Sequence, residues 1–190
     1  GASGLIGGLL AGRLRDSGDY SGIHLLTRRP LGLQPDLMRE HLVDFERLQE
    51  ASDSIGRVDH AFCCLGTTIR KAGSQAAFRR VDHDYVLAFG RLAASLGARS
   101  IVVVSSVGAD ADSRNFYLRV KGETERDLRQ LNLTSLVIVR PSLLTGDRSE
   151  FRLGERFGGV LLAAVSSSLS RSKEKDIYLT IGTSCTFSYG

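Results

Sequence analysis

The run Ile101 to Val104, followed by Ser105 and Ser106, constrains the fold of this chain more than any other feature. Four consecutive β-branched residues are typical of a strand buried on both faces, and such strands occur in parallel sheets covered by helices. Small and polar residues then indicate a loop, and Asn115 can cap a helix that begins near Phe116. The stretch therefore predicts a strand, a loop and a helix of an α/β protein.

Tyr117 and Lys121 lie in the first turns of that helix, and their spacing of four residues places both side chains on one face. A phenol is a poor acid or base at neutral pH unless a nearby positive charge favours its ionised form. Lys121 could supply that charge, and the Ser106 hydroxyl could hold a carbonyl or alcohol oxygen near the phenol. Only four of the 25 lysines and arginines are lysines, which favours a specific role for Lys121. The trio predicts a proton-transfer site; the alternative is an amphipathic helix with a solvated lysine.

Composition excludes several classes of protein. No apolar run approaches the ~20 residues of a membrane span, and no signal peptide is visible, so we expect a cytoplasmic protein without a membrane span. The net charge is +4, but the arginines are scattered, which argues against a nucleic-acid surface. Cys63 and Cys64 are adjacent in an apolar run, Cys185 is alone, and the histidines show no ligand spacing. We expect buried, reduced thiols and no metal site.

A glycine motif, GASGLIG, spans Gly1 to Gly7 and precedes leucines at helical spacing. Glycines at positions 1, 4 and 7 would allow a tight turn, let the backbone approach a pyrophosphate, and bring the following helix close to its sheet. The motif alone is a weak signal, and the alternative is a glycine-rich turn. The strand that normally precedes such a motif is absent from this sequence, so we expect the first strand of the sheet to be missing.

Arginines follow the next strand, which we place at Ile23 to Leu26. The end of this strand contacts the adenosine ribose in a dinucleotide site, where an acidic residue favours NAD and an arginine favours the 2′-phosphate of NADP. Arg28, with Arg29 beside it, therefore points to NADP as the preferred cofactor, with NAD as the second choice. Two exposed arginines in a turn are the alternative interpretation.

Strands and helices alternate along the rest of the chain up to residue 165, which indicates a doubly wound parallel sheet. We expect a strand from Leu42 passing into a helix, a strand at Val58 to Leu65 closed by Gly66-Thr67, a helix at Gln75 to Leu96, a strand at Ser135 to Arg140 ended by Pro141, and a helix at Phe157 to Val165. Residues 1–165 would form one nucleotide-binding domain. Residues 166–190 read as an atypical tail, whose β-prone segment Ile177 to Ser188 could fill the place of the missing strand.

Together these motifs resemble the short-chain dehydrogenase/reductase superfamily. The glycine motif, the Gly66-Thr67 turn and the trio of Ser106, Tyr117 and Lys121 carry the resemblance, which covers about residues 1–165. The runs FCCLGTTIRKAGSQAAFRRVDHDYV, SSVGADADSRNFYLRVKGETE and IVRPSLLTGDR are similar to its atypical branch related to the Tat-interacting oxidoreductase-like proteins. The resemblance implies a Rossmann fold that binds NADP.

The resemblance also assigns roles to residues. It implies that Tyr117 is the general acid/base, that Lys121 holds the nicotinamide ribose and favours the ionised tyrosine, and that Ser106 orients a small-molecule substrate, with Ser105 as its substitute. The expected cofactor-binding residues are Gly1, Ser3, Gly4, Leu5, Ile6, Gly7, Arg28, Arg29, Asp44, Phe45, Leu65, Gly66, Thr67, Lys121 and Pro141.

The sequence also departs from the superfamily. Asp82 stands where many members carry a helix asparagine, which puts a proton relay through that position in doubt, and the tail after about residue 165 differs from the usual substrate-binding segment. Two functions therefore stay open. The chain either transfers hydride between NADPH and a carbonyl or alcohol substrate, or binds NADPH as a regulatory or assembly protein with a protein partner. The oligomeric state stays open as well.

Overall fold

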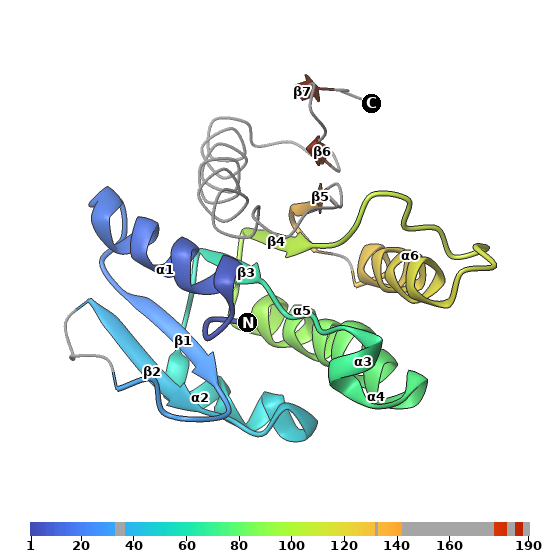
Figure 1. Ribbon diagram of the computed structural model, residues 1–190. Coiled ribbons are helices and arrows are strands. Elements are labelled where there is room, and N and C mark those ends of the chain that lie inside the picture. The colour runs from blue at the N-terminus through green and yellow to red at the C-terminus, as the bar shows by residue number, and fades with distance from the viewer. Residues whose placement is uncertain (33–36, 132, 142–176, 182–184, 188–190) are drawn as a thin grey trace.

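The computed structural model describes residues 1–32, 37–131, 133–141, 177–181 and 185–187. Strands and helices alternate through most of this part, as the sequence predicts (Figure 1). The helices are α1 (Leu5–Ser17), α2 (Ser52–Ile55), α3 (Ile69–Ala72), α4 (Gln75–Arg79), α5 (Tyr85–Ser95) and α6 (Phe116–Arg129), with a 3₁₀ segment η1 (Phe45–Ala51) and a π-helical turn η2 (Arg80–Asp84). The strands are β1 (Ile23–Thr27), β2 (Met38–Leu42), β3 (His60–Cys63), β4 (Ser100–Val104), β5 (Leu136–Pro141), β6 (Ile177–Ile181) and β7 (Cys185–Phe187).

The described strands form two sheets. Strands β1 and β2 pair in parallel, and β3, β4, β5, β6 and β7 follow one another in a second sheet that is parallel except at β7. The parallel α/β architecture agrees with the predicted fold class. Strands β6 and β7 lie beside β5, at the opposite edge of this sheet from β3 (Figure 1). The two strands of this predicted β-prone segment, β6 and β7, therefore do not take the place of the missing strand.

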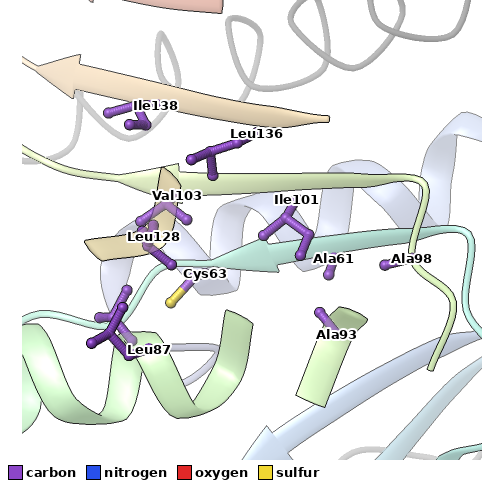
Figure 2. Close-up of a cluster of buried hydrophobic side chains, with 11 residues drawn as sticks. Ala61, Cys63, Leu87, Ala93, Ala98, Ile101, Val103, Leu128, Leu136 and Ile138 are labelled. Carbon is purple, nitrogen blue, oxygen red and sulfur yellow. The ribbon is translucent and has the colours of Figure 1, made fainter. Parts of the chain in front are cut away.

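Helices cover both faces of the larger sheet. On one face Leu10 and Leu14 of α1 pack with Val102 of β4 and Val137 of β5, all in one buried cluster. On the other face α5 and α6 contact the alternate residues of β3, β4 and β5, and Figure 2 shows this second cluster. Because neighbouring strand residues point to opposite faces, the continuous apolar runs are explained by burial on both sides.

A cavity of about 610 Å³ separates β1 from β3. Residues 23–26 of β1 and 60–63 of β3 line two of its sides, and apolar residues of α1 and α5 line further parts, among them Leu10, Leu14, Leu92 and Ala93. Neither β1 nor β3 has a strand partner on this side among the described residues. The gap lies where a doubly wound sheet has its first strand, as the sequence predicts.

Some boundaries differ from those predicted. Strand β2 spans Met38–Leu42 and ends where we expected a strand to start. Its residues are partly or fully exposed and include Arg39, Glu40 and His41, so the apolar pattern that marks the other strands is missing. The predicted helix at residues 157–165 lies outside the described residues. The division of the chain at residue 165 stays a proposal.

Candidate functional site

The glycine loop leads directly into α1. The backbone N–H of Gly4 donates to the Gly1 carbonyl at 3.0 Å, and a Cβ atom at Gly7 would lie only 2.1 Å from that oxygen, so only glycine fits there. The α1 N-cap residue is Gly4, and no side chain caps the helix. The first N–H groups of a helix without such a cap, together with its dipole, form a site that suits an anion such as a pyrophosphate.

The loop also lies against the end of β3. The backbone of Gly1 packs against that of Cys64 and Leu65. Two of the predicted cofactor-binding segments, the glycine loop and the turn after β3, therefore meet at the carboxyl end of β3.

Glu40 of β2 holds the turn that carries the two arginines, a role that the sequence analysis missed. Its carboxylate accepts hydrogen bonds from the Thr27 hydroxyl at 2.8 Å and from the Leu31 backbone N–H at 2.8 Å. Arg28 and Arg29 between these anchors are exposed, and within the described residues neither makes an ion pair. The turn therefore presents two free guanidinium groups on a fixed backbone.

On the expected adenine side, Asp44 and Phe45 have mainly structural contacts. The Asp44 carboxylate accepts from the Glu46 backbone N–H at 3.0 Å and so caps η1. The Phe45 side chain is buried, and its ring centroid lies 5.5 Å from that of Tyr85. The Tyr85 hydroxyl donates to Glu46 at 2.7 Å, and burial, followed by this bond, raises the pKa of Tyr85. Of the two predicted residues, only Asp44 exposes its side chain.

Helix α6 carries Tyr117 and Lys121, and it begins at the predicted residue. The Asn115 side chain accepts from the Leu118 backbone N–H at 3.2 Å, which confirms the predicted cap. A Cβ atom at residue 122 would lie 2.2 Å from the backbone of Asp110 and Ala111, so Gly122 lets the loop after β4 pack directly on α6. This contact fixes the serine-bearing end of β4 relative to the helix.

Lys121 is buried and forms an ion pair with Asp82 of η2, with 2.7 Å between Nζ and Oδ1. The other carboxylate oxygen of Asp82 accepts from the Thr67 backbone N–H at 2.8 Å. A Cβ atom at Gly66 would lie 3.8 Å from Nζ of Lys121. The structure thus brings Gly66, Thr67 and Lys121 together at the end of β3. The Tyr117 ring lies on the same helix, 5.5 Å from the buried ring of Phe78.

The two serines after β4 differ in their partners. The Ser105 hydroxyl donates to the buried carboxylate of Glu125 at 2.6 Å, and Arg140 also donates to Glu125. Among the described residues, the Ser106 hydroxyl donates to the neighbouring carbonyl of Val107 alone, at 3.2 Å. Ser105 is therefore engaged in a buried polar network, whereas Ser106 has a weaker local bond that a ligand could replace.

The remaining predicted residues flank these groups. Ser3 is exposed in the glycine loop, Leu5 is the first residue of α1, and Ile6 packs against the apolar cluster below α1. Pro141 ends β5, and its carbonyl accepts from the Val107 backbone N–H at 3.1 Å. The glycine loop and Pro141 thus lie at the N-terminal end of α1 and the carboxyl end of β5.

Cysteine or metal chemistry has no support in the described residues. Cys63 and Cys64 are free thiols, and burial raises the pKa of both, to about 12 for Cys64, so neither is a thiolate at neutral pH. No group of three histidine, cysteine or acidic residues in the described ranges could hold a metal ion. No described helix is long and apolar enough to cross a membrane.

Comparison with known proteins identifies relatives. Protein HTATIP2 of Rattus norvegicus is 40% identical over 158 residues, which is 82% of this chain and 65% of the relative. Protein FMP52, mitochondrial, of Saccharomyces cerevisiae is 31% identical over 175 residues, covering 91% of this chain and 75% of that protein. The FMP52 protein of Candida glabrata is 34% identical, and the match covers 93% of this chain and 75% of that protein. No family model matches the chain.

Solved structures with the same fold include a carbonyl reductase and a protein in complex with NAD. A carbonyl reductase from Pseudomonas aeruginosa PAO1 has a TM-score of 0.73 at 17% identity, covering 95% of this chain and 93% of that one. MoeE5 in complex with UDP-glucose and NAD has a TM-score of 0.71 at 18% identity, and the match covers 96% of this chain and 74% of that one. At these identities the likeness shows the fold alone.

These relatives correct one prediction. The expected cytoplasmic location is wrong by this comparison, because several FMP52 relatives are named mitochondrial. A charged or apolar composition says little about the compartment, since targeting depends on separate segments. The glycine loop on α1, the parallel sheet and the matches to FMP52 lead to one assignment: the chain belongs to the FMP52 family, is similar to HTATIP2, and has a Rossmann fold.

Proposed function

We propose that this protein is an NADP-dependent oxidoreductase that acts on a carbonyl or alcohol substrate. The observation that carries the proposal is the position of Lys121, which is buried beside the Gly66-Thr67 turn while the glycine loop lies against the same end of β3. Tyr117 is four residues away on α6, and the loop after β4 carries Ser106 to that helix. The residues proposed for cofactor binding and for proton transfer thus lie at one edge of the sheet, and such edges bind ligands in open α/β folds.

The residues present fit a dinucleotide. The uncapped start of α1 and the close-packed glycine loop suit a pyrophosphate, the exposed arginines suit a phosphate on the adenosine ribose, and Lys121 suits the hydroxyls of the nicotinamide ribose. The bound cofactor would supply the hydride.

The protein groups would handle the proton and the orientation of the substrate. Ser106 would donate a hydrogen bond to the substrate oxygen, and Tyr117 would protonate that oxygen during reduction or remove its proton during oxidation. Ser105 is a weaker candidate for the orienting role because its hydroxyl is bonded to Glu125.

The direct test uses the full-length protein with NADPH and a panel of aldehydes and ketones. Substrate-dependent loss of NADPH absorbance supports the proposal. Binding of NADPH without turnover on any member of the panel would instead support the second function, a regulatory or assembly protein. A regulatory or assembly function remains the second proposal, because Asp82 stands in place of the usual asparagine and forms an ion pair with Lys121.

Cofactor preference gives a separate prediction. Replacing Arg28 with Ala should weaken NADPH binding by roughly ten- to a hundredfold, since a hydrogen bond to a charged group contributes about 1.5–3 kcal/mol. NADH has no 2′-phosphate, so its affinity should change by less than about twofold. Titration of both cofactors by fluorescence measures the difference.

The matched control is Arg91→Ala, which removes an exposed arginine from α5 and should alter neither affinity. Comparable losses of NADPH and NADH affinity in Arg28→Ala would show that the arginine does not recognise the phosphate.

A further inference from the structure

Asp82 is almost completely buried, with 1% of its surface exposed, in the π-helical turn between α4 and α5. Its Oδ1 atom lies 2.7 Å from Nζ of Lys121, and its Oδ2 atom accepts from the Thr67 backbone N–H at 2.8 Å. Its backbone carbonyl accepts from the Thr124 hydroxyl at 3.0 Å. The residue thus connects the turn after β3 with two positions on α6.

The two groups that face the carboxylate are both donors. An ionised carboxylate offers only acceptors, whereas an asparagine amide has one acceptor oxygen and an NH₂ group that donates. With asparagine at this position, the NH₂ group would face either Lys121 or the N–H of Thr67. The two contacts therefore favour an acid over an amide at position 82, and the contact of Oδ1 with Lys121 is an ion pair rather than a hydrogen bond.

The pair also fixes where the ammonium lies. Lys121 comes from α6, but its Nζ atom sits next to Gly66, where an added Cβ would be 3.8 Å away. An ammonium has three N–H groups, so Lys121 can donate to a ligand while it keeps its ion pair with Asp82. A lysine side chain without this partner has many rotamers, and ordering it on binding costs free energy.

From this geometry we propose that Asp82 is a positioning residue, which holds the Lys121 ammonium at the Gly66-Thr67 turn for the ribose hydroxyls of the cofactor. The assignment rests on the proposed function, because it requires that Lys121 binds the cofactor. Asp82 itself acts only through Lys121. The departure from the usual asparagine is then part of the cofactor site of this chain, where the acid forms a direct ion pair with Lys121.

A double-mutant cycle on NADPH affinity in the full-length protein tests the assignment. Lys121→Ala alone should weaken NADPH binding, and an unchanged affinity in this variant would contradict the proposed function itself. Asp82→Asn should weaken NADPH binding by about tenfold when Lys121 is present and by less than about twofold in the Lys121→Ala background. Asp84→Asn removes an exposed carboxylate from the same turn and should leave the affinity unchanged.

Equal losses in both backgrounds would overturn the proposal, since Asp82 would then support the fold rather than Lys121. No loss in either background would overturn it as well. Thr124→Val provides a second test if Asp82→Asn does not fold, because it keeps the carboxylate and removes only the hydroxyl that holds its turn. Its loss of NADPH affinity, roughly threefold, should also disappear in the Lys121→Ala background, and its persistence there would contradict the assignment.

Discussion

Replacing Tyr117 with Phe should lower turnover by at least about a hundredfold, the usual contribution of a positioned general acid or base. The affinity for NADPH should change by less than about twofold, because the ring still packs on Phe78 and only the hydroxyl is lost. Steady-state turnover and NADPH titration of the two proteins, on any substrate that the full-length protein reduces, measure both quantities.

Tyr20→Phe is the matched control for this experiment. Tyr20 lines the cavity between β1 and β3, and its ring contacts His60, remote from the end of β3 that carries the site. Loss of this hydroxyl should leave turnover unchanged. Equal activities of the wild-type protein and Tyr117→Phe would exclude Tyr117 as the acid/base.

A second large effect is expected from the cavity between β1 and β3. The backbone groups of Ile23 and Thr27 form hydrogen bonds on the β2 side of β1. Because successive peptide groups of a strand alternate in direction, those of His24 and Leu26 point toward the cavity. By the same alternation, the peptide groups of His60 and Phe62 in β3 point toward the cavity from the other side. Apolar residues of α1 and α5 close its two faces. The cavity therefore suits one more parallel strand with apolar side chains.

Fusing such a strand of about five apolar residues directly before Gly1 should raise the melting temperature by about 10 °C. Each large side chain buried there stabilises the fold by roughly 1.5–3 kcal/mol. After the cost of ordering the added residues, a net stabilisation of about 3–5 kcal/mol should remain for the whole strand. Because Gly1 would then be anchored to the sheet, NADPH should stabilise the fused protein far more than residues 1–190 alone.

The control for this fusion is a Gly-Ser segment of the same length, which should change neither the melting temperature nor the response to NADPH. Thermal unfolding with and without NADPH gives both quantities. A large and equal stabilisation of the original chain by NADPH would contradict the prediction.

Much of the fold was predictable because its strands are buried on both faces. The run at residues 101–104 is wholly β-branched and apolar, those at 23–26 and 135–140 are largely apolar, and each lies within one residue of an observed strand. Strand β2 was misplaced because Arg39, Glu40 and His41 interrupt any apolar pattern. Its position follows from pairing with β1, a tertiary contact that local sequence does not encode.

The site was predictable in its residue types but less so in its contacts. Tyr117 and Lys121 follow from helical spacing, and the cap at Asn115 follows from its side chain. The π-helical turn has no sequence signature, so the inward direction of Asp82 was not foreseen. Glu125 reads as a solvated residue of a charged helix, yet Ser105 and Arg140 pair with it in the interior.

The central claim, that this protein reduces a carbonyl group with NADPH at the Tyr117 site, is tested most directly by isotope transfer. The full-length protein is incubated with NADPH that carries deuterium at the reactive carbon, together with the panel of aldehydes and ketones, and the products are measured by mass spectrometry. Deuterium should appear on the former carbonyl carbon of at least one product with the wild-type protein, and at a rate lower by about a hundredfold or more with Tyr117→Phe. Saturation of the wild-type protein with NADPH, with no deuterium in any product, would contradict the claim.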